Sequence, residues 1–400
     1  MSFNHHLPVL MFGWELPPYN TGGLGVACYG LSKGLSQMGA HIAFALPRQL
    51  PTNLSFVDLV STMDGVKITA INSLLTAYLD ETGFSRLRGN HDGAWYGTSI
   101  YEEAMRFGDM ALLWAKTQPH EIIHAHDWMS YPAAMKAHRY SGKPWIAHVH
   151  ATEFDRTGGN VNQQIADIEY QGLQDADRII AVSRYTKDVI EKRYSIAGSK
   201  IEVIHNGVNM AEFKPMAFRR LFPQDKVVLF VGRLTFQKGV EYFLQAAKEV
   251  LSEKPQTVFL VVGAGDLEQR LIMDASYMGI GHRVLFPGFM SGQNLRALYA
   301  MADVFVMPSI SEPYGIVALE AVASGTPAII SKQSGVAETL SHVFKVDFWD
   351  TAKMSRLIVS ALSHPYFARE MAGLAREEAA RMTWQSAAEK TMRVYEQVLT

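Results

Sequence analysis

The chain has 400 residues, of which 48% are hydrophobic and 19% are charged, and its net charge is −2 at neutral pH. That length predicts two or three domains, and the balanced charge without a basic block argues against a nucleic-acid-binding surface. Cys28 is the only cysteine, which excludes a disulfide framework and a cysteine metal cluster and favours a reducing, cytoplasmic location. We expect neither a secretion signal nor a membrane-spanning helix.

Short apolar runs alternate with helical patterns through the first half of the chain. Runs that are short and almost continuously apolar are typical of strands buried on both faces, as in parallel sheets. Repeated strand–helix order then predicts an α/β fold with right-handed crossovers and a doubly wound sheet. The predicted strands are Leu7–Phe12, His41–Leu46, Ile122–Ala125, Trp145–Val149, Arg178–Val182 and Ile201–Ile204.

A glycine-rich segment, Gly22-Gly23-Leu24-Gly25, lies between the first predicted strand and a helical pattern over residues 26–38. Glycine lets the backbone come close to a phosphate, so Gly22 and Gly23 are candidates for nucleotide binding. The spacing is not G-x-G-x-x-G, and the second strand ends without the acidic residue that a nicotinamide ribose requires. A dinucleotide site is therefore not expected.

Gly83, Gly89, Gly93 and Gly97 lie among charged and aromatic residues in the segment 48–100, which predicts a long loop there. Loops of that length in a compact domain are more often functional than accidental. Trp95 and Tyr96 are candidates for stacking on an acceptor sugar. The alternative is a surface excursion packed by its own aromatic residues, and the sequence leaves both open.

Two H-x-H pairs, His124/His126 and His148/His150, each lie at the end of a predicted strand. Such pairs could ligate a metal, but we favour a core role for the first histidine of each pair. Ligands of doubly wound sheets meet the carboxyl ends of the strands, which favours His126, Asp127 and His150 as cleft residues.

A turn-rich stretch follows Ile204 and predicts a domain boundary after residue 208. Beyond it the strand–helix alternation resumes, with helical patterns such as Val240–Leu251 and Leu267–Tyr277. The predicted strands of this second half are Val227–Val231, Thr257–Val262, Arg283–Phe286, Val304–Met307, Ala328–Ile330 and Val343–Val346.

Two cations, Arg233 and Lys238, follow the first strand of the second half in the segment Gly232–Gly239. Both can reach one diphosphate, and fixed cations stabilise the charge that grows as a nucleoside diphosphate leaves. The alternative is an ordinary solvated loop. No pair of metal-binding carboxylates accompanies them, so we expect an enzyme that works without a metal or other cofactor.

Two carboxylates, Glu312 and Glu320, lie on either side of a loop-to-helix junction. The helix that carries Glu320 is apolar on nearly every side, and a buried carboxylate needs a polar partner or a ligand. Two possibilities therefore stay open for Glu320: it binds a ligand, or it pairs with an arginine or lysine of the protein. The start of the helix offers backbone N–H groups as an anion site, at Tyr314, Gly315, Ile316 and Val317.

The E-x7-E segment and the G-R-L-x-x-Q-K-G segment together resemble the retaining glycosyltransferases of the GT-B fold. The likeness spans almost the whole chain and extends to the glycine loop, to residues 124–128, to the second H-x-H pair and to Met382-Thr383-Trp384. It implies two Rossmann-like domains facing a cleft, an acceptor domain over 1–208 and a nucleotide-sugar donor domain over 209–383. The final helix, 384–400, is similar to the family segment that crosses back onto the first domain.

The resemblance also implies roles for individual residues. Glu320 would bind the ribose hydroxyls, and Glu312 would contact the transferred sugar near its C3 hydroxyl. His150 would lie beside the donor sugar. His126 and Asp127 would lie on the acceptor side.

The function implied is transfer of a hexose, with glucose favoured, from a UDP-, ADP- or GDP-sugar to a hydroxyl acceptor such as a glucan, with retention. Two rivals stay open, a nucleotide-sugar epimerase of GT-B fold and a non-catalytic nucleotide-sugar-binding protein. The helical pattern at Tyr101–Gln118 carries acidic as well as basic residues, so it gives membrane contact only weak support. The sequence does not specify the oligomeric state.

Overall fold

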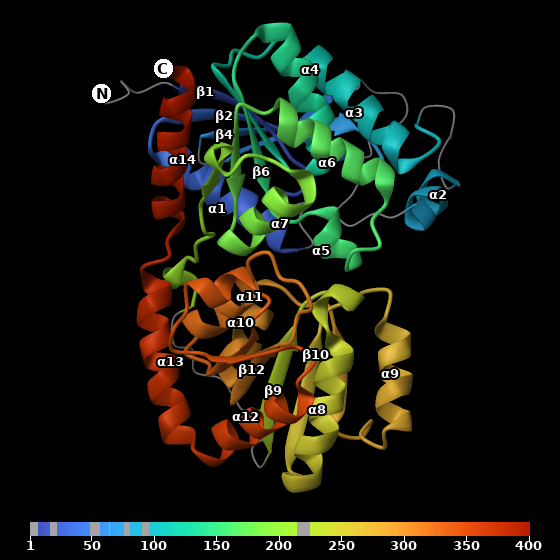
Figure 1. Ribbon diagram of the computed structural model, residues 1–400, viewed down its shortest axis with the longest axis vertical. Helices are drawn as coiled ribbons and strands as arrows, with labels where there is room; N and C mark the ends of the chain where they lie inside the picture. Colours follow the sequence, from blue (N-terminus) through green and yellow to red (C-terminus); the bar gives the residue numbers. More distant parts are fainter. Residues whose placement is uncertain are drawn as a thin grey trace. The chain divides into compact units, whose positions relative to one another are not determined.

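Figure 1 shows the computed structural model of the chain, which describes residues 7–16, 22–48, 57–63, 65–75, 81–89, 96–213 and 225–400. Its internal contacts divide the chain into two compact units. The first unit comprises residues 1–154, 160–207 and 384–400, and the second comprises 155–159 and 208–383. The main boundaries proposed from the sequence were 208 and 383.

The first unit is built on an eight-stranded sheet in the order β3-β4-β2-β1-β5-β6-β7-β8. All six strands predicted for this half are present, and every neighbouring pair is parallel except β3 with β4. The central strands are almost fully buried, which accounts for their continuous apolar runs. The strands are β1 Leu7–Phe12, β2 Ala40–Arg48, β3 Val57–Met63, β4 Val66–Asn72, β5 Ile122–His126, β6 Trp145–Val149, β7 Arg178–Ala181 and β8 Ile201–Val203.

The prediction of one long loop over 48–100 was wrong, because this region contains β3, β4 and the helix α2 (Glu81–Gly89). Tyr96 is buried: its hydroxyl donates to Asn72 Oδ1 at 3.2 Å, and the guanidinium of Arg106 lies over its ring. Tyr96 therefore packs inside the unit and does not stack on an acceptor. Trp95 lies outside the described residues.

Two groups of helices cover this sheet (Figure 1). One contains α3 (Ile100–Ala115), α4 (Tyr131–Ser141) and α6 (Gln163–Asp175). The other pairs α1 (Gly23–Gln37) with the last helix, α14 (Trp384–Leu399). A Cβ added at Gly30 would lie 2.3 Å from the Trp384 ring, and one at Gly34 would lie 2.9 Å from Ala388 Cβ. The two glycines therefore permit the close approach of α14 to α1.

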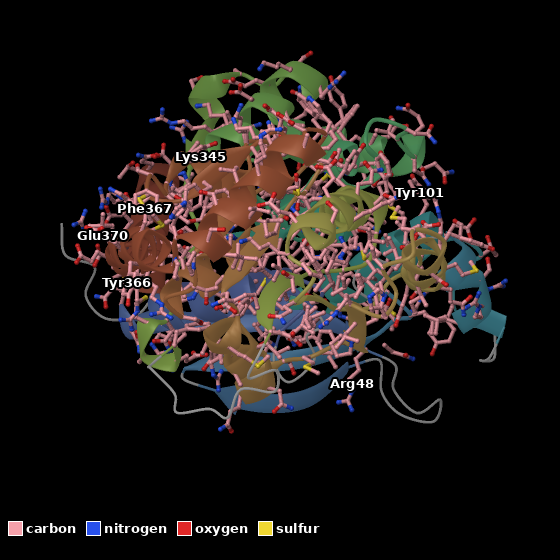
Figure 2. The ribbon with its side chains drawn as sticks, turned by 90° about the horizontal axis from the view of Figure 1, so that it is seen from below. Arg48, Tyr101, Lys345, Tyr366, Phe367 and Glu370 are labelled. Carbon is pink, nitrogen blue, oxygen red and sulfur yellow. The ribbon has the colours of Figure 1, made fainter. Side chains whose placement is uncertain are left out.

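The helical pattern considered for membrane contact corresponds to α3. Its apolar face is buried in the core of the first unit through residues such as Phe107 and Trp114. Tyr101, labelled in Figure 2, is only partly buried. An apolar face already covered by protein is not available to a bilayer, so α3 gives no support to membrane contact. Within the described part of the chain, no helix is both long enough and apolar enough to span a membrane.

The second unit has a six-stranded, fully parallel sheet in the order β11-β10-β9-β12-β13-β14. All six strands predicted for this half are present: β9 Lys226–Val231, β10 Thr257–Val262, β11 Val284–Gly288, β12 Val304–Met307, β13 Ala328–Ser331 and β14 Phe344–Val346. The change of direction between β9 and β12 is a topological switch point, where ligands of such sheets bind at the carboxyl ends of the strands.

Two groups of helices also cover the second sheet. The helix α8 (Val240–Glu253) packs against α9 (Glu268–Tyr277) and α12 (Thr351–Ser363). The other group contains α10 (Gly292–Met301), α11 (Ile316–Ala323) and α13 (Pro365–Ala380). Figure 2 labels Tyr366, Phe367 and Glu370 on α13; both aromatic side chains are exposed.

Candidate active site

The loop after β9 carries the two predicted cations and is fixed by backbone contacts. Gly232 N–H donates to Val262 O at 3.0 Å, and Leu234 N–H donates to Ala264 O at 3.0 Å. Gly263 has φ +145°, and a Cβ there would lie 1.8 Å from Gly232 O. The loops that follow β9 and β10 therefore pack backbone against backbone at the switch point, which holds the Arg233 segment at the carboxyl ends of the strands.

Lys238 and Glu312 are 74 residues apart in sequence and form an ion pair of 2.7 Å between Nζ and Oε2. Ser309 Oγ donates to the same carboxylate oxygen at 3.0 Å. Gly239, the residue after Lys238, has φ +65°, and a Cβ there would lie 2.2 Å from Pro308 O, so this turn excludes any larger residue. The two residues predicted to bind diphosphate and sugar thus meet each other.

Arg233, the second predicted cation, is half-buried. Its Nη2 lies 3.4 Å from Gln237 Oε1, and the Gln237 amide donates in turn to Ser311 O at 3.0 Å. Gln237 therefore links the cationic loop to the residue before Glu312. This link was not predicted, because Gln237 is uncharged and its contact with Ser311 O joins segments that are far apart in the sequence.

The segment before α11 is extended and pairs with the loop after β13. Glu312 N–H donates to Gln333 O at 2.9 Å, and Gly335 N–H donates to Glu312 O at 2.9 Å. Gly315 then turns the chain with φ +108°, a conformation that favours glycine. The N–H groups of Ile316 and Val317 lie in the first turn of α11, where a helix has no internal acceptor for them.

Tyr314, predicted as a donor-binding residue, has a buried side chain. Its hydroxyl lies 3.7 Å from Met382 Sδ, and burial raises its pKa above the usual range. Any contact of Tyr314 with a ligand therefore falls to its backbone rather than to its phenol.

Glu320 has the polar partner that its position on an apolar helix requires. The hydroxyl of the buried Tyr299, on α10, donates to Glu320 Oε2 at 3.0 Å. Burial raises the pKa of Glu320 to about 7, and the hydrogen bond from Tyr299 opposes part of that rise. The partner is a neutral tyrosine rather than an arginine or lysine. No local sequence pattern marks Tyr299, because it lies on the preceding helix.

In the first unit, the predicted glycine loop forms the start of α1. Gly22 is the N-cap, Gly23 begins the helix, and Glu15 Oε2 accepts from Gly25 N–H at 2.9 Å. A carboxylate of the protein thus already lies at this helix N-terminus and offsets its positive end.

The four histidines of the H-x-H pairs form one cluster: His124 and His126 lie on β5, His148 lies on β6, and His150 directly follows β6. His124 Nε2 lies 3.1 Å from His148 Nδ1, and His126 Nδ1 lies 2.9 Å from His150 Nε2. His124 Nδ1 also lies 2.7 Å from the hydroxyl of Tyr395 on α14. The rings stack, with centroids 4.6 Å apart for His124 and His126 and 4.3 Å apart for His148 and His150.

Burial keeps this histidine cluster uncharged. It lowers the pKa of His124 and of His150 to about 3. The pKa values of His126 and His148 are also lowered, by burial first and then by the neighbouring imidazoles. At neutral pH the cluster therefore acts through neutral N–H donors and nitrogen acceptors, not through positive charge.

His126 and Asp127 were predicted to face a ligand, but both are buried. Asp127 Oδ1 accepts from the backbone N–H of His150 at 2.7 Å and of Ala151 at 3.3 Å. Asp127 also has φ +59°, a strained value for a residue other than glycine. That these two residues lie on the acceptor side stays a prediction; in the structure both touch His150, the half-buried member of the cluster.

Comparison with known proteins identifies the family to which the chain belongs. Residues 21–212 match the family model described as Glycosyltransferase Family 4, and residues 214–390 match the model described as Glycosyl transferases group 1. An uncharacterised glycosyltransferase of Methanocaldococcus jannaschii is 30% identical over 350 residues, covering 84% of this chain and 83% of that protein. A glycogen synthase of Mycobacterium tuberculosis is 29% identical over 398 residues, covering 97% and 94%.

The fold is shared with solved structures at lower identity. The sucrose-phosphate synthase of Thermosynechococcus elongatus has a TM-score of 0.81 at 22% identity, covering 98% of this chain and 99% of that one. Similarity at that level shows the fold. Together with the family matches on both halves, it establishes that the chain belongs to the family 4 and group 1 glycosyltransferases and is a transferase of the GT-B fold.

Proposed function

We propose that the protein is a retaining hexosyltransferase that moves glucose from a nucleoside diphosphate sugar to a hydroxyl group of a saccharide acceptor. The observation that carries the proposal is the meeting of Lys238, Glu312 and the start of α11 in the second unit. A cation and helix N–H groups suit a diphosphate, and a carboxylate suits sugar hydroxyls. One relative is a glycogen synthase and one structure of the same fold is a sucrose-phosphate synthase, which favours a glucan or another saccharide as the acceptor.

The Lys238–Glu312 ion pair is the resting form of the donor site in this proposal. When the donor binds, Lys238 exchanges part of its contact with Glu312 for the diphosphate, and Glu312 accepts a hydrogen bond from a hydroxyl of the transferred sugar. Because each group already holds the other in place, little side-chain ordering is left to be done on binding. Arg233 supplies the second cation.

The remaining donor contacts follow from α11. The N–H groups of Gly315, Ile316 and Val317 bind diphosphate oxygens, and Glu320 accepts hydrogen bonds from the ribose hydroxyls. Tyr299 already occupies Glu320 Oε2, which leaves Oε1 as the natural acceptor for the ribose. A carboxylate that accepts from a donor substrate acts best when ionised, so the raised pKa of Glu320 links donor binding to pH.

The chemical step needs no protein nucleophile and no metal. The acceptor oxygen forms its bond to the anomeric carbon as the bond from that carbon to the phosphate oxygen breaks. The acceptor proton passes to the departing phosphate oxygen on the same face of the sugar, so the configuration is retained. Arg233 and Lys238 stabilise the charge that develops on the diphosphate. His150, positioned by Asp127 and His126, orients the reacting sugar through neutral hydrogen bonds.

Two measurements test this function. Thermal shift with UDP-, ADP- and GDP-glucose, and with the matching nucleotides alone, should identify one donor that raises the unfolding temperature. Proton NMR of the product formed with a glucan acceptor should then show the anomeric configuration of the donor. An inverted product, or stabilisation by none of the nucleotide sugars, contradicts the proposal. A free altered sugar formed without acceptor would favour an epimerase instead.

A further inference from the structure

Three potential metal ligands from three different elements meet in the first unit. Cys28 lies on α1, His126 ends β5 and His150 follows β6. One ligand atom from each of these side chains lies within 4.8 Å of the ligand atoms of the other two. Tetrahedral zinc with one sulfur and two nitrogen ligands needs spacings of about 3.3 to 3.6 Å. Movements of about 1 Å would therefore close the site.

The ligand chemistry selects a thiophilic dication. One thiolate with two imidazoles is a set that suits Zn²⁺, whereas Mg²⁺, Ca²⁺ and Mn²⁺ prefer carboxylate and carbonyl oxygens. Three protein ligands leave a fourth position for water. The half-buried His150 gives the site a route to solvent, while Cys28 and His126 are buried.

An unsatisfied nitrogen points to a ligand at the same place. His126 Nε2 is buried and has no hydrogen-bond partner among the described residues. Buried polar atoms are nearly always satisfied, so such an atom calls for an explanation such as an ion or a water molecule. The other nitrogen of the same ring, Nδ1, lies 2.9 Å from His150 Nε2. Because Nδ1 already makes that contact, Nε2 is the nitrogen of His126 that would bind the metal.

The charges around Cys28 favour a cation. Burial first, and then the carboxylates of Glu15 and Asp127, raise the pKa of the Cys28 thiol. A dication would offset these negative charges and would also ionise the thiol that it binds.

We propose that Cys28, His126 and His150 form a binding site for a thiophilic dication such as Zn²⁺, and that occupancy inhibits the transferase by holding His150 on the metal. The inhibition rests on the proposed role of His150, whereas the metal site does not. The competing set in the same cluster is His124, His126 and His148. Both nitrogens of His124 already make hydrogen bonds, to Tyr395 and to His148, so that set offers fewer available lone pairs.

The single cysteine of the chain makes the site directly observable. The chelator-treated protein is titrated with Co²⁺ and separately with Cd²⁺, and absorption is followed in the region of thiolate-to-metal charge transfer. We expect a saturable band with one equivalent of metal per chain, and Zn²⁺ should abolish the cobalt band. Because no other thiol exists, the band can come only from Cys28.

Variants separate this site from its neighbour. Cys28→Ser and Cys28→Ala should lose the band and weaken Zn²⁺ binding by at least about a hundredfold. Removing a residue that only hydrogen-bonds to a metal ligand already weakens binding by about 10- to 100-fold, and removing a ligand itself should cost more. His282→Asn, an exposed histidine in the second unit, is the control and should bind like the parent. Tight binding of one equivalent by both Cys28 variants, or no band in the parent, overturns the proposal.

The inhibition is measured as the ratio of turnover with and without Zn²⁺ within each variant. The parent should lose activity at the concentration that fills the site spectroscopically, and Cys28→Ser should keep its own metal-free rate at that concentration. A filled site with full turnover would refute the inhibitory role while leaving the metal site standing. A band in a protein that transfers no sugar at all would leave the metal site standing and would refute the proposed function instead.

Discussion

The two units differ in the charge of the polar side chains near the carboxyl ends of their strands. In the second unit, Lys238 and Glu312 are both part of an ion pair of 2.7 Å, so buried charge is compensated by its opposite. In the first unit, four stacked histidines are kept neutral by burial. This difference matches the proposed division of roles, in which the second unit binds a charged leaving group and the first orients neutral hydroxyl groups.

The largest expected effect is on stability in acid. The folded-state pKa values of the four histidines lie below the ordinary value of 6.5, so the stability that depends on their neutrality is complete above pH 6.5 and is lost as the pH falls from there. Each such histidine contributes about 1.4 kcal/mol per pH unit in that range. We expect urea unfolding of the parent to show several kcal/mol lost between pH 6.5 and 5.

The matched variants are His148→Asn, inside the cluster, and His282→Asn, which is exposed. His148→Asn should lower the slope of the unfolding free energy against pH by the contribution of one histidine, about 1.4 kcal/mol per pH unit. His282→Asn should leave that slope unchanged. Imidazole NMR signals of the cluster that titrate between pH 5 and 8 would show that the histidines are not held neutral.

Glu320 should give a pH dependence of the opposite sign. Its folded pKa, about 7, lies above the unfolded value near 4.5, so its contribution to stability is complete below pH 4.5 and is lost as the pH rises through 7. The difference in the free energy of unfolding between the parent and Glu320→Gln should therefore change by up to about 3 kcal/mol between pH 5 and pH 8. Equal pH profiles for the two proteins would show that Glu320 is ionised throughout.

A smaller effect is expected at the start of α1. Gly23→Val adds a branched side chain where the backbone is proposed to approach the donor, and the helix itself should form. We expect donor affinity to fall on the order of tenfold, or about 1.4 kcal/mol, with little change in circular dichroism. Calorimetric titration with the donor identified by thermal shift is the measurement. An unchanged Kd would remove this loop from the donor site.

The smallest effect is expected for chelation. Because Arg233 and Lys238 supply the positive charge for the leaving diphosphate, EDTA should not lower the transfer rate. If the purified protein carries Zn²⁺ at Cys28, EDTA should raise the rate. Loss of activity in EDTA that only Mg²⁺ or Mn²⁺ restores would contradict metal-independent transfer.

The sequence predicted the parallel strands well because a strand buried on both faces leaves a continuous apolar run. It failed at β4, where Lys67 and Thr69 interrupt the apolar residues and β3 pairs with it in the antiparallel direction. Only Lys67 of β4 is exposed and Thr69 is buried, so its polar residues conceal a strand that is largely buried.

The candidate site was predictable where charge sits in a short motif. Arg233, Lys238, Glu312 and Glu320 were predicted in this way, and the structure brings Lys238 to Glu312. The partners that complete the site were not, because Tyr299 and Ser309 are ordinary residues whose importance depends on tertiary contacts. The burial of Asp127 was missed for a similar reason: its positive φ, which turns the carboxylate toward the backbone of His150, leaves no mark in the sequence.

The most direct test of the central claim is kcat and donor KM for Arg233→Ala and Lys238→Ala, with Lys226→Ala as the control. Lys226 is paired with Asp303 at the opposite end of β9 and should stay within a factor of about two of the parent. Each of the other two variants should lower kcat about a hundredfold, near 3 kcal/mol, while circular dichroism shows a folded protein. If both leave kcat within a factor of about two, the diphosphate does not bind at these residues and the proposed donor site is wrong.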